Sequence, residues 1–427
     1  MPMYQDQAIN DEIMEKMNLK NRYTFFNNNL MAILSPEQFN FLRKVQRFCM
    51  RYEKKNNIQH SMDEDLYQWI PDFGAEGYVS RSYKMDELDI NYEEHGAVAE
   101  MMRIFSVDQF DTQFCMAMGA TILAINAIKA HHEGIPERLD ALRDLITGKE
   151  CGAILITEPE RGSDAVHQLT VTEPQEDGSL IVNGEKIFNT NSPKAKWVVG
   201  YGTAVANEGN QMTQYLINTS WDGWKSERVF IPWTPKIWIG HNHLTNIRVP
   251  PEYVLGGIGK GRGHLFEGLI LERIGIAVGN VAQAWTALSH AFIYINMRKQ
   301  FSQEILKFQG VGFTFADYWA RTTNLTIGLL KFCEEYDKKM EKFGGEIPRN
   351  ISQAMIASSS HFKLEASRLS ERCCYEMANL MGGAGVCDNT LMWDLVGISR
   401  IQEIVGGTRQ IQQYIISMAN RQLWKML

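Results

Sequence analysis

The sequence lacks an excess of basic residues and a long apolar run. Its 427 residues include 43 Lys and Arg against 50 Asp and Glu, which gives a formal net charge of −7. Non-specific nucleic-acid binding depends on clustered basic side chains, so this composition excludes it. The longest apolar stretch, residues 115–128, contains Asn126 and is shorter than the ~20 residues that a membrane-spanning helix needs.

Paired cysteines and an export signal are also missing. The first residues, MPMYQDQAINDEIMEKM, contain acids and no apolar core of a signal peptide. No C-x-x-C pair and no regular spacing occurs, in a chain too long to need disulfides for stability. The cysteines are Cys49, Cys115, Cys151, Cys333, Cys373, Cys374 and Cys387. We therefore expect free thiols, no membrane span and a cytoplasmic protein.

Several motifs of common enzyme classes are absent. No register of the glycine-rich run at residues 256–263 fits G-x-G-x-x-G or a P-loop, so we expect a flexible hairpin there. His241 and His243 are too close-set for a helical metal pair, and His131 and His132 are adjacent. Neither H-E-x-x-H nor G-x-S-x-G occurs. The sequence therefore predicts no metal site and no serine hydrolase.

The hydrophobic periodicity changes along the chain. Residues 35–150 follow a helical pattern, residues 151–255 alternate short β-type runs with Gly, Asp and Asn, and residues 256–427 are helical again. Residues 1–34 form a poorly patterned N-terminal extension. We predict an α+β multidomain fold: an N-terminal helical domain, a small antiparallel β-barrel or sandwich, and a C-terminal four-helix bundle.

Local signals locate individual elements. The run SPEQ from Ser35 has the N-cap and the proline of a helix start. Strand candidates are residues 179–184, 197–201, 214–217 and 248–249, with hairpin turns at residues 176–178 and at Asn183-Gly184. Amphipathic or apolar helices are predicted for residues 114–130 and 135–146 and, in the bundle, near residues 264–300, 305–345, 350–381 and from Thr408.

Four short segments combine glycine, hydroxyl and aromatic residues. They are ITEPERGSD from Ile156, GEKIFNTN from Gly184, MGGAG from Met381 and IVGGTRQIQ from Ile404. Each is weak alone, because Thr-Glu-Pro can cap a helix and Gly-Gly can form a turn. Together, in this order on an α–β–α chain, they resemble the acyl-CoA dehydrogenase family of flavoproteins over residues 35–427.

The resemblance implies FAD as the cofactor. It assigns Thr157 and Thr190 to the flavin ring as donors, Phe188 to stacking on that ring, and Ser163 to the neighbourhood of the pyrophosphate. The cofactor-binding residues that it implies are Ile156, Thr157, Gly162, Ser163, Phe188, Thr190, Arg298, Phe301, Gln309, Asn379, Gly382, Gly383, Thr408 and Gln410.

Part of this set also implies an assembly. Arg298, Phe301 and Gln309 match the family's R-x-x-F-G…Q segment, with Ser302 in place of the usual Gly, and Asn379 replaces the Gln before the Gly-Gly pair. In the family these residues reach the FAD of a neighbouring subunit. The resemblance therefore implies a homo-oligomer, a tetramer or a dimer.

The family's chemistry also needs a carboxylate base, because proton abstraction beside a thioester is uphill without one. Most members carry a Glu in a Y-E-G-T loop, where this sequence has Gly406. Isovaleryl-CoA and long-chain enzymes carry it instead on the first bundle helix before an Arg, and Glu272-Arg273 matches that context. Two alternatives to a catalytic base remain. Glu272 could form an ion pair with a Lys or Arg on a solvated face, or the protein could be a catalytically dead paralogue. Asp111 aligns with a common acid of the family, and we expect it to be a structural cap rather than a second base.

The resemblance thus implies an FAD-dependent acyl-CoA dehydrogenase that forms a 2-enoyl-CoA. Glu272 would take the α-proton, the Gly406 N–H would steady the enolate, and the β-hydride would pass to flavin N5. Arg273 and Ser163 would bind substrate, and electron-transfer flavoprotein would reoxidise the cofactor. Alternatives are an oxidase, an enoyl-CoA reductase, a desulfinase, a non-catalytic flavoprotein or a cofactor-free helical scaffold. The sequence leaves the acyl chain open.

Overall fold

The computed structural model describes residues 11–204, 211–345, 347–387 and 390–424. The chain divides into two compact units. Unit 1 comprises Met1–Glu64, Gly96–Cys115 and Arg273–Leu427, and unit 2 comprises Asp65–His95 and Met116–Glu272. Each unit combines segments that are distant in the sequence. The four domain ranges drawn from periodicity alone stay a prediction.

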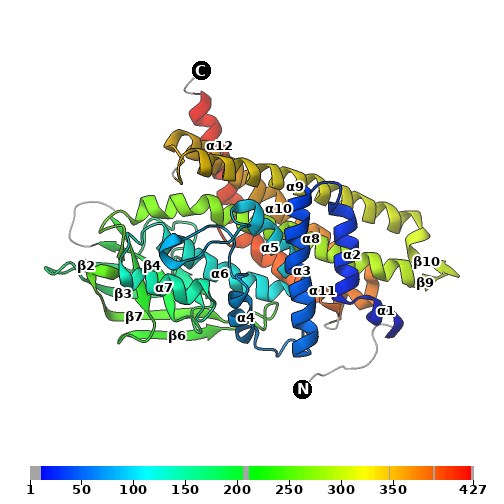
Figure 1. The fold of residues 1–427 in the computed structure, drawn as a ribbon, viewed down its shortest axis with the longest axis horizontal. Coiled ribbons are helices and arrows are strands. Elements are labelled where there is room, and N and C mark those ends of the chain that lie inside the picture. Colours follow the sequence, from blue (N-terminus) through cyan, green and yellow to red (C-terminus); the bar gives the residue numbers. More distant parts are fainter. Residues whose placement is uncertain (1–10, 205–210, 346, 388–389, 425–427) are drawn as a thin grey trace. The chain divides into compact units, whose positions relative to one another are not determined.

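Unit 2 is built around a mixed sheet with the strand order β6-β7-β3-β2-β4-β5-β8, in which β1 pairs with β4 (Figure 1). The strands are β1 (Gly152–Leu155), β2 (Val171–Pro174), β3 (Leu180–Thr190), β4 (Trp197–Ala204), β5 (Met212–Asn218), β6 (Trp224–Val229), β7 (Ile239–Val249) and β8 (Val254–Leu255). The predicted strand runs fall on β3, β4, β5 and β7. Most pairs are antiparallel, as predicted, but β1 and β2 both run parallel to β4.

Two glycine-based predictions were wrong in detail. Asn183 and Gly184 lie inside β3 and form no turn, where the pairing with β7 shifts register between Val182 and Gly184. Gly184 has a φ of 153°, and a Cβ there would lie 2.5 Å from Thr170 Oγ1, so the glycine permits close backbone approach. The run at residues 256–263 forms no hairpin, because β8 ends before it and α8 (Gly261–Met297) begins within it.

Helices complete unit 2. They are η1 (Leu66–Trp69), α4 (Ile70–Ala75), η2 (Asp86–Leu88), most of α6 (Thr112–Lys129), α7 (Pro136–Ile146) and η3 (Pro251–Tyr253). The two helices predicted for residues 114–130 and 135–146 are α6 and α7. Arg138 of α7 donates to the carbonyl oxygens of Glu252 at 2.6 Å and Val254 at 2.8 Å. These bonds hold α7 against the chain that leads into β8.

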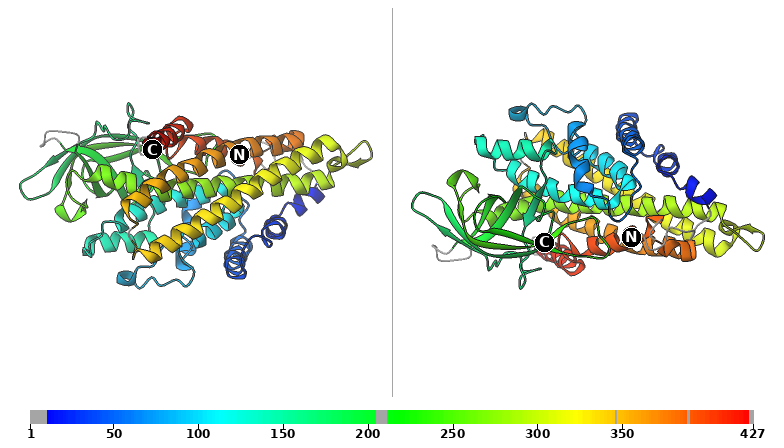
Figure 2. Two further views of the ribbon diagram at one scale, coloured as in Figure 1. Left: turned by 90° about the horizontal axis from the view of Figure 1, so that it is seen from above. Right: turned by 90° about the horizontal axis from the view of Figure 1, so that it is seen from below.

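Unit 1 is largely helical. It contains α3 (Pro36–Asn56), α5 (Ala97–Phe110), the greater part of α8, the hairpin of β9 (Lys299–Gln300) and β10 (Gln303–Glu304), η4 (Ile305–Lys307), α9 (Gln309–Lys342), α10 (Arg349–Met381), η5 (Gly382–Val386), α11 (Met392–Ile404) and α12 (Arg409–Trp424). Ser35 caps α3 as predicted, since its Oγ accepts from the Gln38 amide at 3.3 Å. The predicted bundle helices correspond to α8, α9, α10 and α12, and α9 and α10 lie side by side (Figure 2).

Four α-helices of unit 1 were not predicted individually. One of them, α5, is buried along almost its whole length, so it shows no amphipathic stripe. Helix α11 is buried on several sides, so it shows no amphipathic stripe. Within the extension at residues 1–34, the structure contains α1 (Asp11–Lys16) and α2 (Leu19–Leu30). Tyr23 Oη of α2 donates to the Ser106 carbonyl oxygen at 2.6 Å, and the Phe26 ring lies 5.8 Å from the Trp285 ring. The extension is therefore partly core, and its many polar residues hid the apolar spacing.

No helix within the described part of the chain is long and apolar enough to cross a membrane.

Candidate functional site

The residues predicted to bind cofactor and substrate are divided between the two units. Unit 2 carries Ile156, Thr157, Gly162, Ser163, Phe188, Thr190 and Glu272. Unit 1 carries Arg273, Arg298, Phe301, Gln309, Asn379, Gly382, Gly383, Gly406, Thr408 and Gln410. Within each unit, contacts show which predicted segments come together.

In unit 2, the segment that follows β1 runs beside β3. The Ile187 amide donates to the Thr157 carbonyl oxygen at 2.9 Å, so the Thr157 loop lies next to Phe188. Phe188 has a φ of 59° at an irregularity of the β3–β7 pairing, and its side chain is 58% exposed. Positive φ is uncommon for a bulky residue. The backbone thus presents an aromatic ring to which a planar ring system can stack.

Residues 159–160 and 162–164 of this loop are exposed to solvent. Glu158 and Arg161 exchange backbone hydrogen bonds at 3.0 and 3.1 Å, which closes a tight turn. Gly162 and Ser163 follow the turn and are exposed. An added Cβ at Gly162 would meet nothing within 4 Å. The turn therefore offers a hydroxyl and free approach to the backbone, as a phosphate ligand requires.

A buried ion pair that the sequence analysis did not assign fixes the loop to β3. Lys186 Nζ lies 2.9 Å from Glu158 Oε1 and also donates to Gln168 Oε1. The Glu158 carboxylate further accepts from the backbone amides of Leu169 at 2.6 Å and Thr170 at 2.8 Å. The available sequence signal was the two-residue alternation of β3, which puts Lys186 on the same face as the buried Leu180 and Val182.

The two charges of this pair stabilise one another. Burial lowers the pKa of the Lys186 ammonium to about 8, and the Glu158 charge opposes that shift. Burial alone would raise the pKa of the Glu158 carboxyl, but Lys186 and the hydrogen bonds from Thr170 and Leu169 hold it below its usual value. Both groups therefore remain ionised near neutral pH, and the pair links the Thr157 loop to the strand that carries Phe188.

Glu272 lies on the apolar helix α8. Its side chain is half-buried, and Ile270 and Ile274 on the same helix are buried. Burial raises the pKa of the Tyr201 phenol, and the charge of Glu272 raises it further, which places the carboxylate near that ring. The adjacent Arg273 is buried. Glu272 is thus not on a fully solvated face, the position expected if it were only a surface ion-pair partner.

In unit 1, side-chain donors fix the loop between α11 and α12. Gly406 and Gly407 have φ values of 64° and 90°. Gln412 Nε2 donates to the carbonyl oxygens of both glycines at 2.9 Å, and Lys363 Nζ donates to that of Gly407 at 2.8 Å. The loop that carries Gly406 is therefore held in one conformation, and a side chain at position 406 would be strained.

The β9–β10 hairpin presents Phe301 to solvent. Its side chain is 90% exposed, and Phe301 and Ser302 have φ values of 50° and 67°. The family's glycine at the position of Ser302 suits this backbone, and the serine adopts the same left-handed region. Arg298 precedes the hairpin, where its carbonyl oxygen accepts from the Ile305 amide at 2.9 Å, and Gln309 begins α9.

The remaining predicted residues of unit 1 lie at helix ends. Asn379 lies in the last turn of α10, where its carbonyl oxygen accepts from the Gly382 amide. Gly382 and Gly383 are exposed, and an added Cβ at either would meet nothing within 4 Å. Thr408 precedes α12 and is half-buried, and Gln410 in its first turn is exposed. These groups are accessible to a ligand.

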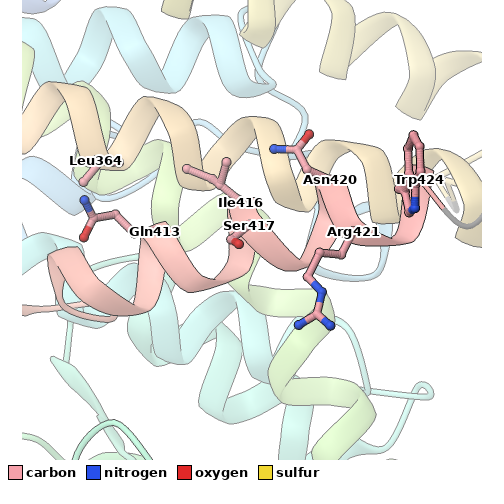
Figure 3. A pocket seen from close by; sticks show the side chains of 7 residues that line it. All are labelled: Leu364, Gln413, Ile416, Ser417, Asn420, Arg421 and Trp424. Atoms are coloured by element: carbon pink, nitrogen blue, oxygen red, sulfur yellow. The ribbon is translucent and has the colours of Figure 1, made fainter.

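Unit 1 also contains a groove that none of these residues lines. It has a volume of about 650 Å³ and lies between α10 and α12 (Figure 3). Its lining residues are Leu364, Gln413, Ile416, Ser417, Asn420, Arg421 and Trp424. None of the predicted cofactor, substrate or catalytic residues is among them.

Asp111 is a structural cap, as predicted. Its Oδ1 accepts from the Phe114 amide at 2.9 Å, in the first turn of α6, and its Oδ2 lies 3.1 Å from His60 Nδ1. The nearby Asp108 is buried and accepts from Thr286 Oγ1 at 2.8 Å. Burial raises the pKa of the Asp108 carboxyl to about 8, against the opposing effects of Thr286 and Arg22.

Asp108 should make the stability of the protein fall as the pH rises. An unfolded Asp has a pKa of ~3.9, so its proton is retained only by the folded state between that pH and about 8. The stabilisation is complete below pH ~4 and is lost as the pH rises through the folded pKa, by up to ~1.4 kcal/mol per pH unit.

An Asp108→Asn variant cannot titrate at this position. The melting temperature of the variant minus that of the wild type should therefore increase as the pH rises from 5 to 8. Thermal unfolding of both proteins measures this difference. A constant difference between the two proteins over this range would contradict the assignment.

Comparison with known proteins finds acyl-CoA dehydrogenases among the similar proteins. A family model described as "Acyl-CoA dehydrogenase, C-terminal domain" matches residues 259–420. Isovaleryl-CoA dehydrogenase of Oryza sativa is 26% identical over 371 residues, which are 85% of this chain and 84% of the relative. An acyl-CoA dehydrogenase of Bacillus subtilis is 27% identical over 392 residues, 88% of this chain and 96% of the relative.

The fold agrees with these matches. Butyryl-CoA dehydrogenase from Megasphaera elsdenii superposes with a TM-score of 0.78 at 21% identity, over 90% of this chain and 98% of that chain. The chain is thus similar to acyl-CoA dehydrogenases along most of its length, and residues 259–420 match the C-terminal domain of that family, whose members are FAD-dependent oxidoreductases.

FAD is the cofactor that this family uses, and the residues present fit it. The exposed Phe188 ring suits a flat ring system, and the hydroxyls of Thr157 and Ser163 can serve as donors. At Gly162, Gly382 and Gly383 no neighbouring atom fills the space beside the backbone.

Proposed function

We propose that the protein catalyses the α,β-dehydrogenation of an acyl-CoA thioester to the 2-enoyl-CoA. Glu272 is proposed to take the α-proton. The observation that carries this proposal is the position of Glu272: a half-buried carboxylate on an apolar helix, close enough to raise the pKa of Tyr201. A base in such surroundings is partly shielded from water, which favours proton abstraction.

Gly406 and Arg273 are proposed to bind the thioester and its arm. The backbone N–H of Gly406 would donate to the thioester oxygen as enolate charge develops, and a glycine offers that donor as well as any residue does. The hydrogen bonds from Gln412 and Lys363 keep this loop pre-organised. Arg273, which follows the base directly, and Ser163 would bind the substrate outside the reacting carbons.

Residues on several elements are proposed to bind FAD, which when bound supplies the acceptor for the β-hydride. Thr157, Phe188 and Thr190 would hold the flavin ring. Arg298 and Phe301 would reach the FAD of a neighbouring subunit in a homo-oligomer. Electron-transfer flavoprotein is proposed as the acceptor that reoxidises the enzyme, and a cytoplasmic location remains a prediction.

The test is anaerobic reduction of the FAD-loaded protein by a panel of linear, branched, cyclic and aryl acyl-CoA thioesters. We expect at least one thioester to bleach the visible flavin absorbance and to yield the matching 2-enoyl-CoA by mass spectrometry. Failure of the whole panel would contradict the proposal, as would a purified protein that takes up no FAD.

The same panel separates other reactions on this scaffold. A caffeyl-CoA reductase–Etf complex subunit from Acetobacterium woodii is 26% identical over 300 residues, and PigA has been solved with FAD and proline. Enoyl-CoA thioesters with the reduced protein, and proline with the oxidised protein, therefore belong in the panel. Oxygen consumption without an added acceptor would indicate an oxidase.

A further inference from the structure

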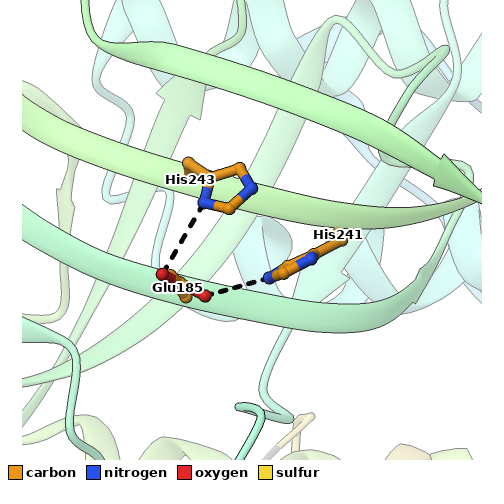
Figure 4. Close-up of side chains that lie close together, drawn as sticks. All are labelled: Glu185, His241 and His243. Carbon is orange, nitrogen blue, oxygen red and sulfur yellow. Dashed lines mark hydrogen bonds and ion pairs between the residues drawn. The ribbon is translucent and has the colours of Figure 1, made fainter.

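A cluster of two histidines and a glutamate lies on the exposed face of the sheet in unit 2. We propose that Glu185, His241 and His243 form a binding site for a divalent transition-metal ion of the zinc type (Figure 4). The three residues come from the neighbouring strands β3 and β7. The site is independent of the proposed dehydrogenation.

The strand register brings these side chains to one face. His241 and His243 are two residues apart on β7, so their side chains point to the same side of the sheet. The intervening Asn242 points inward, where its Nδ2 donates to Asn189 Oδ1 at 2.9 Å. Glu185 on β3 is directly opposite His243. The spacing that is too short for a pair on a helix is the correct one for a pair on a strand.

The ligand atoms are already close together. His241 Nε2 lies 3.0 Å from Glu185 Oε2, and His243 Nδ1 lies 3.8 Å from Glu185 Oε1. All three ligand groups lie within 4.8 Å of one another. A tetrahedral zinc site, with metal–ligand distances of ~2.0–2.2 Å, needs its ligand atoms ~3.3–3.5 Å apart. Small side-chain rotations therefore suffice to bind an ion.

The surroundings favour a cation. On the other side of β7, Glu227 of β6 is opposite His241, and Lys225 is opposite His243. Lys225 Nζ lies 2.5 Å from Glu227 Oε1, so its charge is paired within β6. The carboxylates of Glu185 and Glu227 and one ammonium group lie beside the two imidazoles, so acidic side chains outnumber Lys225 here. Water or Glu227 can supply the fourth ligand.

Metal binding would connect β7 to β3 and raise the stability of the sheet. Strand β6 lies at one end of the strand order, next to β7, and β3 continues from Glu185 to Phe188 and Thr190. An ion that binds only the folded protein stabilises it by mass action, so the melting temperature should rise with metal concentration. This effect does not depend on enzymatic activity.

The experiment uses tag-free, FAD-loaded, chelator-treated protein titrated with Zn²⁺ alone by calorimetry, and with Co²⁺ by visible absorption. We expect one saturable site and a Zn²⁺-dependent rise in melting temperature. Removing a residue that only hydrogen-bonds to a metal ligand weakens metal binding by ~10–100-fold. Because His241 and His243 are themselves proposed ligands, His241→Gln and His243→Gln should each weaken Zn²⁺ binding by more than about tenfold. Glu185→Gln should weaken it too.

His132→Gln is the matched control. His132 also lies beside a carboxylate, with its Nε2 4.0 Å from Glu87 Oε1, but it is not part of the cluster. This variant should bind Zn²⁺ as the wild type does. Equal Zn²⁺ affinity in the wild type and the three cluster variants would overturn the proposal, as would a melting temperature that does not respond to Zn²⁺. Each variant is compared only when it retains FAD and the wild-type circular dichroism spectrum.

Discussion

Replacing Glu272 with Gln is expected to slow flavin reduction by acyl-CoA by about 10²–10⁴-fold, the usual contribution of a general base, while the protein keeps its FAD. The amide has nearly the same shape as the carboxylate but cannot accept the α-proton. Because Glu272 is half-buried on α8, the isosteric change should preserve the packing around Ile270 and Ile274. Stopped-flow absorbance of the anaerobic protein measures the rate.

A second readout isolates the proton transfer. The wild type should exchange the α-hydrogen of a bound thioester with D₂O, and Glu272→Gln should not. The control is Glu365→Gln on α10, where the glutamate pairs with Arg368 at 3.1 Å on the surface, and this variant should behave as the wild type does. An unchanged reduction rate, or normal α-exchange in Glu272→Gln, would remove Glu272 from the role of base.

Replacing Glu158 with Gln is expected to destabilise the protein by about 3–5 kcal/mol, the cost of leaving one charge of a buried pair alone. Lys186 is fully buried and Glu158 is 3% exposed, with 2.9 Å between Nζ and Oε1. The variant keeps a hydrogen-bonding side chain but removes the counter-charge. Because the pair joins the Thr157 loop to β3, FAD should also dissociate more readily. Thermal unfolding and flavin release measure the two effects.

Two further variants separate charge from packing. Adding Lys186→Met to Glu158→Gln removes the unpaired ammonium and should recover part of the lost stability, since apolar replacement of a whole buried pair is often tolerated. Glu335→Gln is the exposed control: Glu335 pairs with Lys331 at 2.9 Å in solvent, and its loss should leave the melting temperature unchanged. If Glu158→Gln and Glu335→Gln lowered the melting temperature equally, the claim that the buried ion pair matters more than the exposed one would be contradicted.

Periodicity predicted most regular elements, because an amphipathic helix or strand carries its burial pattern in its own sequence. Ser35 marked the start of α3, and the apolar runs marked β3, β4 and β5. The prediction failed where that pattern is hidden: α11 is buried on several sides, and α2 has many polar residues between its buried ones. The hairpin turn predicted at Asn183-Gly184 was wrong for another reason. An Asn-Gly pair suits both a tight turn and a close approach of two strands.

By itself, the sequence determined the class of fold, because hydrophobic periodicity is local in the chain. The resemblance of its motifs to a known family supplied the candidate base. Only the tertiary structure decided which side chains meet. Glu158 and Lys186 are 28 residues apart and form a pair only because the Thr157 loop folds onto β3. Glu185 and His243 are opposite one another only through the register of β3 and β7. Strand pairing is non-local, so no pattern within either segment contains it.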